Sequence, residues 1–264
     1  MGEALLSRLI ARKVYKPSEI IVSEPSSSRR SSLQQQYGVE VTGENRRVLL
    51  ETSVILLAVK PQVFDAVAAQ IAEAIAVLNH ESSPLPLVIS ILAGVSLSKI
   101  EAACPNLPVI RAMPNTPATV GAGMTAICLG THTDDVQKQT AQKLFVAVGE
   151  IVEVPETLMD AVTGLSGSGP AFVAMMVEAL SDGGVAAGLP REIANQLAIQ
   201  TVKGTVQLLK EKGIHPAELK DKVTSPGGTT IAGVAALERA GFRSSLIQAV
   251  LAATKRSQEL GAGG

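Results

Sequence analysis

Aromatic residues are scarce in this chain of 264 residues, which contains no Trp, two Tyr and four Phe. Proteins that bind single-stranded nucleic acid stack the bases on aromatic side chains, so the composition argues against that class. An excess of one charge is also lacking, because 23 Lys and Arg stand against 24 Asp and Glu and leave a net charge of -1. Without a basic surplus we expect no nucleic-acid partner.

Cysteine, histidine and long apolar runs are in short supply as well. The two cysteines, Cys104 and Cys128, form no CxxC pair and no disulfide framework, which favours a reducing compartment. The three histidines, His80, His132 and His215, are too scattered for a metal-binding motif, so we expect no metal. No run approaches the ~20 apolar residues of a membrane span, and no signal peptide is recognisable. We therefore expect a cytoplasmic protein that does not bind a membrane.

Hydrophobic residues make up 46% of the chain, which suffices for a packed core. Over the first half of the chain, short apolar runs alternate with helix-like periods. The expected strands are 20–22, 39–41, 54–59, 87–92, 109–113, 124–129 and 151–154. The expected helices are 3–11, 45–52, 63–78, 96–103 and 134–148, with a polar segment leading into a solvated helix at 26–36. This alternation predicts a doubly wound α/β sheet.

From residue 157 onward the periods are helical only. The expected helices are 172–187, 191–211, 216–221, 229–239 and 243–260. Pro190 suits the first position of a helix, and Gly188 and Gly213 suit helix ends. We therefore predict an α/β domain of residues 1–154 and an all-α domain of residues 155–264.

In a doubly wound sheet, ligands bind where the strands end. Three segments end a predicted strand with suitable residues, namely AVKP at 58–61, SILAG at 90–94 and RAMPNTP at 111–117. They offer a cation beside a rigid turn, small residues that admit a flat ligand, and a polar loop held by two prolines. Each also has an ordinary interpretation, as a solvated Lys60, a helix-entry turn and a structural turn.

The helical half contains a stronger signal, TSPGGTT at 224–230, directly before a predicted helix. Successive backbone N–H groups at a helix N-terminus bind carboxylate or phosphate, and the Thr hydroxyls add donors. An ordinary helix cap is the alternative, because Ser and Thr are common caps. GLSGSGP at 164–170 is similar in kind, and there we favour a close-packed turn at the domain junction.

Reactive side-chain constellations are missing. The sequence contains neither a GxSxG elbow nor a P-loop motif. We interpret both cysteines as small core residues rather than nucleophiles. An enzyme built in this way would work by positioning a cofactor and a substrate.

In combination, four segments resemble the pyrroline-5-carboxylate reductase family: AVKPQ (58–62), RAMPNTP (111–117), LSGSGPAFV (165–173) and DKVTSPGGTTIAG (221–233). Their order and spacing carry the match, which runs almost throughout residues 162–261 and more loosely over the rest. The resemblance implies a Rossmann-like N-terminal domain and an all-helical C-terminal domain that forms a homodimer, with larger homo-oligomers common. It also implies that NAD(P)H reduces a small molecule, L-1-pyrroline-5-carboxylate, to L-proline in the last step of proline biosynthesis.

The resemblance implies roles for individual residues as well. Thr230 would donate a hydrogen bond to the ring nitrogen of the substrate and is the candidate catalytic residue. The substrate carboxylate would be held by Ser225, Gly227, Gly228 and Thr229. The cofactor would be bound by Gly2, Asn45, Ala58, Val59, Lys60, Pro61, Ile91, Leu92 and Ala93. Met113 and Asn115 would lie near its nicotinamide.

The start of the chain departs from the family pattern, which opens with a strand and a GxGxM turn at a helix N-terminus. Only Gly2 matches a family glycine, so the Rossmann-like domain lacks its first strand. That strand would be central in the sheet, and its neighbours would lose ladder hydrogen bonds on one side. We expect the true start to lie upstream; otherwise the cofactor site is impaired.

The cofactor preference depends on the residues that follow the strand at 20–22. Glu24 would suit the ribose 2′-OH of NADH, whereas Ser23 with Arg29 and Arg30 would suit the 2′-phosphate of NADPH. We favour NADPH, although both arginines would also fit a solvated helix face.

Two rival functions remain. A β-hydroxyacid dehydrogenase would carry a catalytic Lys where this chain has Val173, and the absence of that Lys argues against this function. A non-catalytic oligomerising homologue would keep the helical dimer and would have lost hydride transfer, and the incomplete glycine-rich turn favours it.

Overall fold

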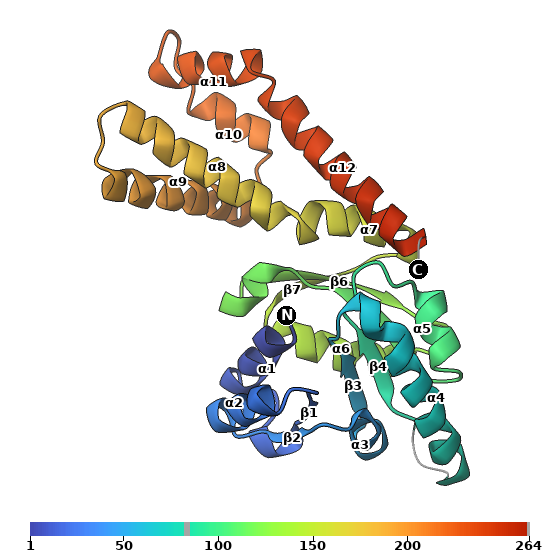
Figure 1. The fold of residues 1–264 in the computed structure, drawn as a ribbon. Helices are drawn as coiled ribbons and strands as arrows, with labels where there is room; N and C mark the ends of the chain where they lie inside the picture. Colours follow the sequence, from blue (N-terminus) through green and yellow to red (C-terminus); the bar gives the residue numbers. More distant parts are fainter. Residues whose placement is uncertain (82–84, 263–264) are drawn as a thin grey trace. The chain divides into compact units, whose positions relative to one another are not determined.

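The computed structural model describes residues 1–81 and 85–262, which form two compact units (Figure 1). Unit 1 consists of Met1–Gly167 and the chain from Ala253 onward, and unit 2 consists of Ser168–Ala252. A short helical connection after residue 155 is grouped with unit 1. The division into domains after residue 154 stays a prediction.

Strands and helices alternate through unit 1, as the sequence predicts. The strands are β1 (Ile21–Ser23), β2 (Glu40–Thr42), β3 (Val54–Leu57), β4 (Leu87–Ser90), β5 (Val109–Met113), β6 (Gly123–Leu129) and β7 (Gly149–Glu153). The α-helices are α1 (Gly2–Ala11), α2 (Ser27–Tyr37), α3 (Asn45–Glu51), α4 (Phe64–Glu81), α5 (Leu97–Ala103), α6 (Asp135–Val146) and α7 (Met159–Val162). Short 3-10 turns lie at η1 (Pro17–Glu19), η2 (Pro61–Val63), η3 (Thr116–Val120) and η4 (Glu156–Leu158), and η5 (Thr163–Gly167) is a π-helical turn.

The strands form two sheets, β1-β2 and β3-β4-β5-β6-β7. Most pairs are parallel, for example Val54 with Leu87 between β3 and β4. The exception is β5 with β6, where Ile110 pairs with Leu129 in the antiparallel sense. The chain between these two strands contains only η3, which is too short for the crossover that parallel strands need. The last two strands of the sheet, β6 and β7, therefore run opposite to β3, β4 and β5.

The two sheets are separated between β1 and β3, which is where the first strand of the family pattern is expected. β1 pairs only with β2, and β3 is an edge of the five-stranded sheet. Helix α1 joins the two sheets, because Leu5 and Leu9 lie in a core of the large sheet while Leu6 packs with Leu33 and Val39 of the small one. One amphipathic helix thus holds together two sheets that share no backbone hydrogen bonds in the described chain.

The two faces of the large sheet have separate cores, because side chains alternate along a strand. On β5, Val109 lies in a core with α4, α5 and α7, whereas Ile110 lies in a core with α1 and α6. Cys104 and Cys128 belong to the first core, and burial raises the pKa of their thiols to about 12 and about 11. Both cysteines are small core residues, as predicted.

Unit 2 is entirely helical. It contains α8 (Gly169–Ala186), α9 (Arg191–Lys212), α10 (Pro216–Lys222), α11 (Thr229–Arg239) and the first half of α12 (Phe242–Ala262). Helices α8 and α9 are linked by a hydrogen bond of 2.5 Å from Ser181 Oγ to Asn195 Oδ1 and by an ion pair of 2.6 Å between Arg191 and Asp182. No helix in the described part of the chain has the length and apolarity needed to cross a membrane.

Candidate active site

Strands β3, β4 and β5 run parallel, so their carboxyl ends lie at one edge of the large sheet. The predicted cofactor-binding segments follow these ends: Ala58–Pro61 follows β3, Ile91–Ala93 follows β4, and Asn115 comes two residues after β5. Three segments that are far apart in the sequence therefore meet at the edge where α/β sheets bind their ligands.

The N-terminus of α1 lies at the same edge, because Gly2 is packed against Ala58. A Cβ atom on Gly2 would lie 2.9 Å from the Ala58 Cβ atom, which is closer than two carbon atoms tolerate. The helix can begin here only because Gly2 has no side chain. A helix N-terminus presents free N–H groups and partial positive charge, which suit the pyrophosphate of a dinucleotide.

Glu3, in the first turn of α1, binds two residues of α2. Tyr37 Oη donates a hydrogen bond of 2.9 Å to Glu3 Oε1, and Arg29 forms an ion pair with the other carboxylate oxygen. The Tyr37 hydrogen bond is the main cause of the lowered pKa of Glu3. Because Arg29 offsets the carboxylate, the start of α1 stays compatible with a phosphate group.

The segment after β3 ends in an exposed cation. Lys60 precedes Pro61, which opens the turn η2, and Val63 N donates to Lys60 O at 3.0 Å. Val59 is half-buried against the core, whereas the Lys60 side chain is exposed. The backbone of this segment is thus fixed, and Lys60 can reach an anionic ligand or remain in solvent.

The segment after β4 offers mainly backbone. The Leu92 side chain is only 2% exposed and lies in the core with α4 and α5, so it cannot line a groove with its side chain. Ile91 is half-buried on the opposite face, and Ala93 is exposed. A ligand at this strand end would meet the small Ala93 and the main chain around Leu92.

Asn115, after β5, is held by both ends of its amide. Its Nδ2 atom donates to Ser166 O at 3.1 Å and to Ser166 Oγ at 3.3 Å, and its Oδ1 atom accepts from Met124 N at 2.9 Å. Met113 packs against Gly167 of the same turn, with its Cε atom 2.8 Å from the position that a Cβ on Gly167 would take. The expected close-packed turn at 164–170 is a π-helical turn, η5, which ends at the boundary between the two units and is followed by the start of α8.

Asn45 is the first residue of α3, which follows β2 in the chain. Its Nδ2 atom donates to Gln70 Oε1 of α4 at 2.9 Å. Helix α4 packs on the large sheet, so this hydrogen bond links α3, which follows the small sheet in the chain, to the large sheet.

The loop after β1 is organised by Arg30. Its Nη1 atom donates to Glu24 O at 2.7 Å and to Pro25 O at 2.9 Å, so Arg30 holds the loop rather than pointing into solvent. The Glu24 carboxylate accepts a hydrogen bond of 2.9 Å from Ser26 N at the start of α2.

In unit 2, the predicted substrate segment forms a tight turn ahead of α11. Gly228 N donates to Ser225 O at 3.1 Å, Pro226 takes the second position, and Gly227 has a φ of +66°. This is the pattern of a type II turn, which needs a residue with positive φ at its third position. The turn places Gly228 as the N-cap of α11.

Thr229 and Thr230 are the first two residues of α11 and are exposed. Their N–H groups belong to the first turn of the helix, where no intrahelical acceptor exists. Hydroxyl and N–H donors thus gather at one helix end, which can accept a carboxylate.

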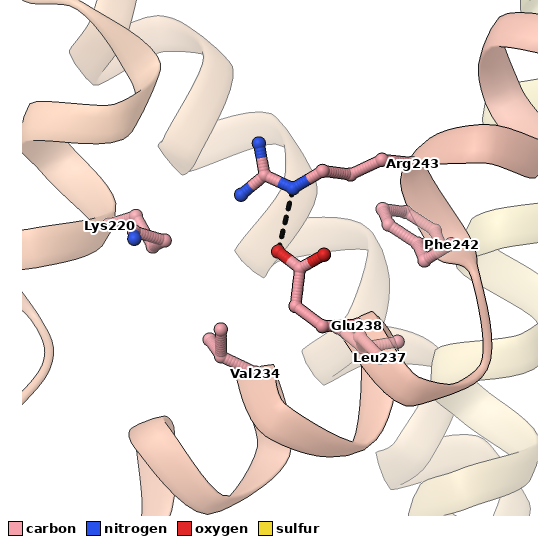
Figure 2. Close-up of a pocket in the computed structure, with 6 residues that line it drawn as sticks. All are labelled: Lys220, Val234, Leu237, Glu238, Phe242 and Arg243. Atoms are coloured by element: carbon pink, nitrogen blue, oxygen red, sulfur yellow. Dashed lines mark hydrogen bonds and ion pairs between the residues drawn. The ribbon is translucent and has the colours of Figure 1, made fainter.

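A separate cavity of about 280 Å³ lies further along unit 2 (Figure 2). Within it, Arg243 Nε donates to Glu238 Oε1 at 2.6 Å. Its lining residues are Lys220, Val234, Leu237, Glu238, Phe242 and Arg243. None of the predicted substrate residues contributes to it. Among the residues whose side chains are described, which do not include His80, no group of three or more His, Cys, Asp or Glu could hold a metal.

Sequence reasoning missed an ion pair between a buried arginine of β5 and a half-buried glutamate of η4. Arg111 of β5 is 6% exposed, and its Nη1 atom lies 3.0 Å from Glu156 Oε1. A charged residue inside the otherwise apolar run VIRAM was the signal that could have found it.

Comparison with family models agrees with this arrangement. Residues 156–260 match the model described as "Pyrroline-5-carboxylate reductase dimerisation". Residues 1–94 match the model described as "NADP oxidoreductase coenzyme F420-dependent". With the Rossmann-like sheet and the helical second unit, these matches define an NAD(P)-dependent oxidoreductase with a dimerisation domain.

The chain belongs to the pyrroline-5-carboxylate reductase family. It is 60% identical to the pyrroline-5-carboxylate reductase of Synechocystis sp. over 261 residues, which cover 99% of this chain and 95% of that protein. It is 43% identical to the reductase of Arabidopsis thaliana, covering 98% of this chain and 92% of that protein. The crystal structure of Plasmodium falciparum pyrroline carboxylate reductase with NADP bound superposes with a TM-score of 0.88 at 30% identity, over 99% of this chain and 94% of the other. The family differs from that of the β-hydroxyacid dehydrogenase alternative.

Proposed function

We propose that this chain catalyses the NAD(P)H-dependent reduction of L-1-pyrroline-5-carboxylate to L-proline, the last step of proline biosynthesis. The observation that carries the proposal in the structure is the turn Ser225–Gly228, which leads into the exposed Thr229 and Thr230. The substrate has one carboxylate and one C=N bond, and a helix end with hydroxyl donors suits both groups. The near-complete coverage of the Synechocystis relative supports the same reaction.

Unit 1 fits a dinucleotide. The contact of Gly2 with Ala58 leaves a helix N-terminus open at the ligand edge, and Ala93 adds a second small residue there. Bound NAD(P)H would supply the hydride that reduces the C=N carbon. The proposed cofactor residues are Gly2, Asn45, Ala58, Val59, Lys60, Pro61, Ile91, Leu92, Ala93, Met113 and Asn115. Of these, Asn115 acts by holding η5 in place, since both ends of its amide are engaged.

Unit 2 would hold the substrate. Ser225, Gly227, Gly228 and Thr229 would bind the carboxylate, largely through backbone N–H groups. Thr230 would donate a hydrogen bond to the ring nitrogen and so orient the C=N bond. A cyclic imine is basic enough to be protonated near neutral pH, so the reaction does not require a strongly acidic side chain.

NADPH is the proposed preference over NADH. Arg30 lies beside the end of β1, where its Nη1 atom donates to Glu24 O, so a positive charge stands at the loop that would meet a 2′-phosphate.

A homodimer, assembling into a larger homo-oligomer, is the proposed state. Among the described residues of unit 2, only Ser181, Ala194 and Ala198 are buried. Large apolar side chains are exposed on its helices, with Met175 68%, Leu197 52%, Val206 59%, Ile247 58% and Leu251 56% exposed. Unit 2 therefore has almost no core of its own, and a second copy would supply the missing burial. The helical domain is proposed to span residues 155–264.

The cytoplasm is the proposed location. The buried thiols of Cys104 and Cys128 are unpaired, which fits a reducing compartment.

The interrupted sheet favours one alternative, a non-catalytic homologue with an impaired cofactor site. To decide, NADPH oxidation would be followed on adding pyrroline-5-carboxylate to the full chain, with NADH in parallel. Turnover would establish the reductase. If turnover were absent even after an apolar strand and a glycine-rich turn had been added ahead of Gly2, the non-catalytic alternative would hold.

A further inference from the structure

Arg111 carries a charge where the surrounding fold is apolar. It lies in the middle of β5 on the same face as Val109, which belongs to the core with α4 and α5. A buried guanidinium needs a partner, because an uncompensated charge in this environment is strongly destabilising. Glu156 provides that partner from η4, with Oε1 3.0 Å from Arg111 Nη1.

The same oxygen of Glu156 has a second partner on another element. Leu97 N, the first residue of α5, donates to Glu156 Oε1 at 2.5 Å. The N-cap Ser96 accepts from Lys99 N at 3.2 Å, so two of the free N–H groups of this helix end are satisfied by side chains. One carboxylate atom therefore joins the start of α5 to the middle of β5.

Both connections lead to the ligand edge of the sheet. Leu97 comes four residues after Ala93, at the end of the segment that follows β4. Arg111 comes two residues before Met113 on β5. Moving the Glu156 carboxylate would therefore disturb two of the three segments that meet at this edge.

We propose that Glu156 is a positioning residue for the nicotinamide dinucleotide. It holds the segment after β4 through Leu97 N and the end of β5 through Arg111, without touching the cofactor itself. The inference rests on the proposed cofactor role of these segments, and it adds a residue outside all of them.

The first test compares two substitutions at the same position. Glu156→Gln keeps a side-chain oxygen that can accept from Leu97 N and Arg111, whereas Glu156→Ala removes it. We expect Glu156→Ala to raise the Kd and KM for NADPH about tenfold while kcat at saturating NADPH stays within about twofold, because Glu156 acts on the segments that bind the cofactor and not on the reacting atoms. We expect Glu156→Gln to restore most of the affinity. Glu153→Gln, at an exposed ion pair with Lys138, is the matched control.

The second test removes the donor instead of the acceptor. Leu97 is the first residue of α5, where proline is tolerated, and Ser96 before it has an extended backbone with ψ of 158°. Leu97→Pro deletes the N–H group, and Leu97→Ala loses a similar amount of packing but keeps that group. We expect the Kd for NADPH to rise several-fold more in Leu97→Pro than in Leu97→Ala.

NADPH binding to the full wild-type chain, followed by fluorescence, separates the possible failures. Wild-type protein that bound neither NADPH nor NADH would overturn the proposed function and the positioning role together. Wild-type binding with an unchanged Kd in Glu156→Ala, or with an equal Kd in Leu97→Pro and Leu97→Ala, would overturn the positioning role alone. A lower Tm with unchanged Kd would likewise reduce Glu156 to a structural residue.

Discussion

Gly2 and Ala58 are in such close contact that a Cβ atom on Gly2 would lie 2.9 Å from the Cβ atom of Ala58. The contact fixes the start of α1 against the end of β3. Both the stability of unit 1 and its affinity for the cofactor are therefore expected to depend on Gly2.

Gly2→Ala is expected to displace α1 from β3. Overlap of this kind costs about 1–3 kcal/mol in a packed region, and the Kd for NADPH should rise because the helix N-terminus moves. Thermal unfolding and NADPH titration measure the two effects. Ser7→Ala, on the same helix, should leave NADPH binding unchanged; equal affinity in Gly2→Ala would show that the helix end takes no part.

Thr230→Ala is expected to lower kcat about tenfold or more, since a hydrogen bond to a charged or polarised group contributes about 1.5–3 kcal/mol. The side chain is exposed, so Tm should hardly change. Thr230→Ser keeps the hydroxyl and should retain most of the turnover. Steady-state kinetics with saturating NADPH distinguish these variants, and normal turnover in Thr230→Ala would remove the residue from the mechanism.

Gly227→Ala tests the backbone of the turn, because nothing lies within 4 Å of the added Cβ and φ is +66°. A positive φ at an Ala costs about 1–2 kcal/mol, so the turn should relax and the KM for pyrroline-5-carboxylate should rise. Gly227→Asn should be milder, because Asn tolerates this conformation. Equal KM values for wild type and Gly227→Ala would speak against a carboxylate held by this turn.

Asn115→Asp is expected to lower the free energy of unfolding by about 1–3 kcal/mol, because it leaves Ser166 O without its donor and sets a carboxylate against it. The acceptor for Met124 N is kept, which isolates the contact with η5. Urea unfolding gives the measurement. Thr119→Val, at the exposed neighbouring turn η3, is the control and should change little.

Glu3 should make stability depend on pH in the acid range. The hydrogen bond from Tyr37 lowers the pKa of Glu3 in the folded protein. The resulting stabilisation is complete above the ordinary Glu pKa of about 4.3, and it is lost as the pH falls through the lower folded-state pKa. Tyr37→Phe should raise the Glu3 pKa, as read by NMR titration of its carboxyl carbon. An unchanged titration would assign the shift to Arg29 instead.

Local patterns predicted most of the elements. β5 has the predicted bounds Val109–Met113 because Pro108 and Pro114 enclose its apolar run. α11 has the predicted bounds Thr229–Arg239 because the Gly-Gly pair ahead of it ends the turn. These signals lie within a few residues of the feature that they mark.

Features that depend on distant partners were not predictable in the same way. Arg111 and Glu156 are 45 residues apart, and Asn115 and Ser166 are 51 apart. Periodicity reports which face a residue occupies, but it does not report which side chain from another element reaches that face. The reversed direction of β6 and the π-helical turn η5 likewise follow from packing. Strand ends and a helix start marked the candidate ligand segments, and the family resemblance supplied the roles of the individual residues.

The break between β1 and β3 changes which backbone amides of unit 1 should exchange with solvent first. In a continuous sheet, inner strands are protected from hydrogen exchange on both sides, and exchange starts at the rim. Here β3 is bonded only to β4 within the described chain, although α1 covers the junction between both sheets. The amides of β3 that are not bonded to β4 are therefore expected to exchange sooner than those that are, and their exchange would report on the edge where α1 carries Gly2.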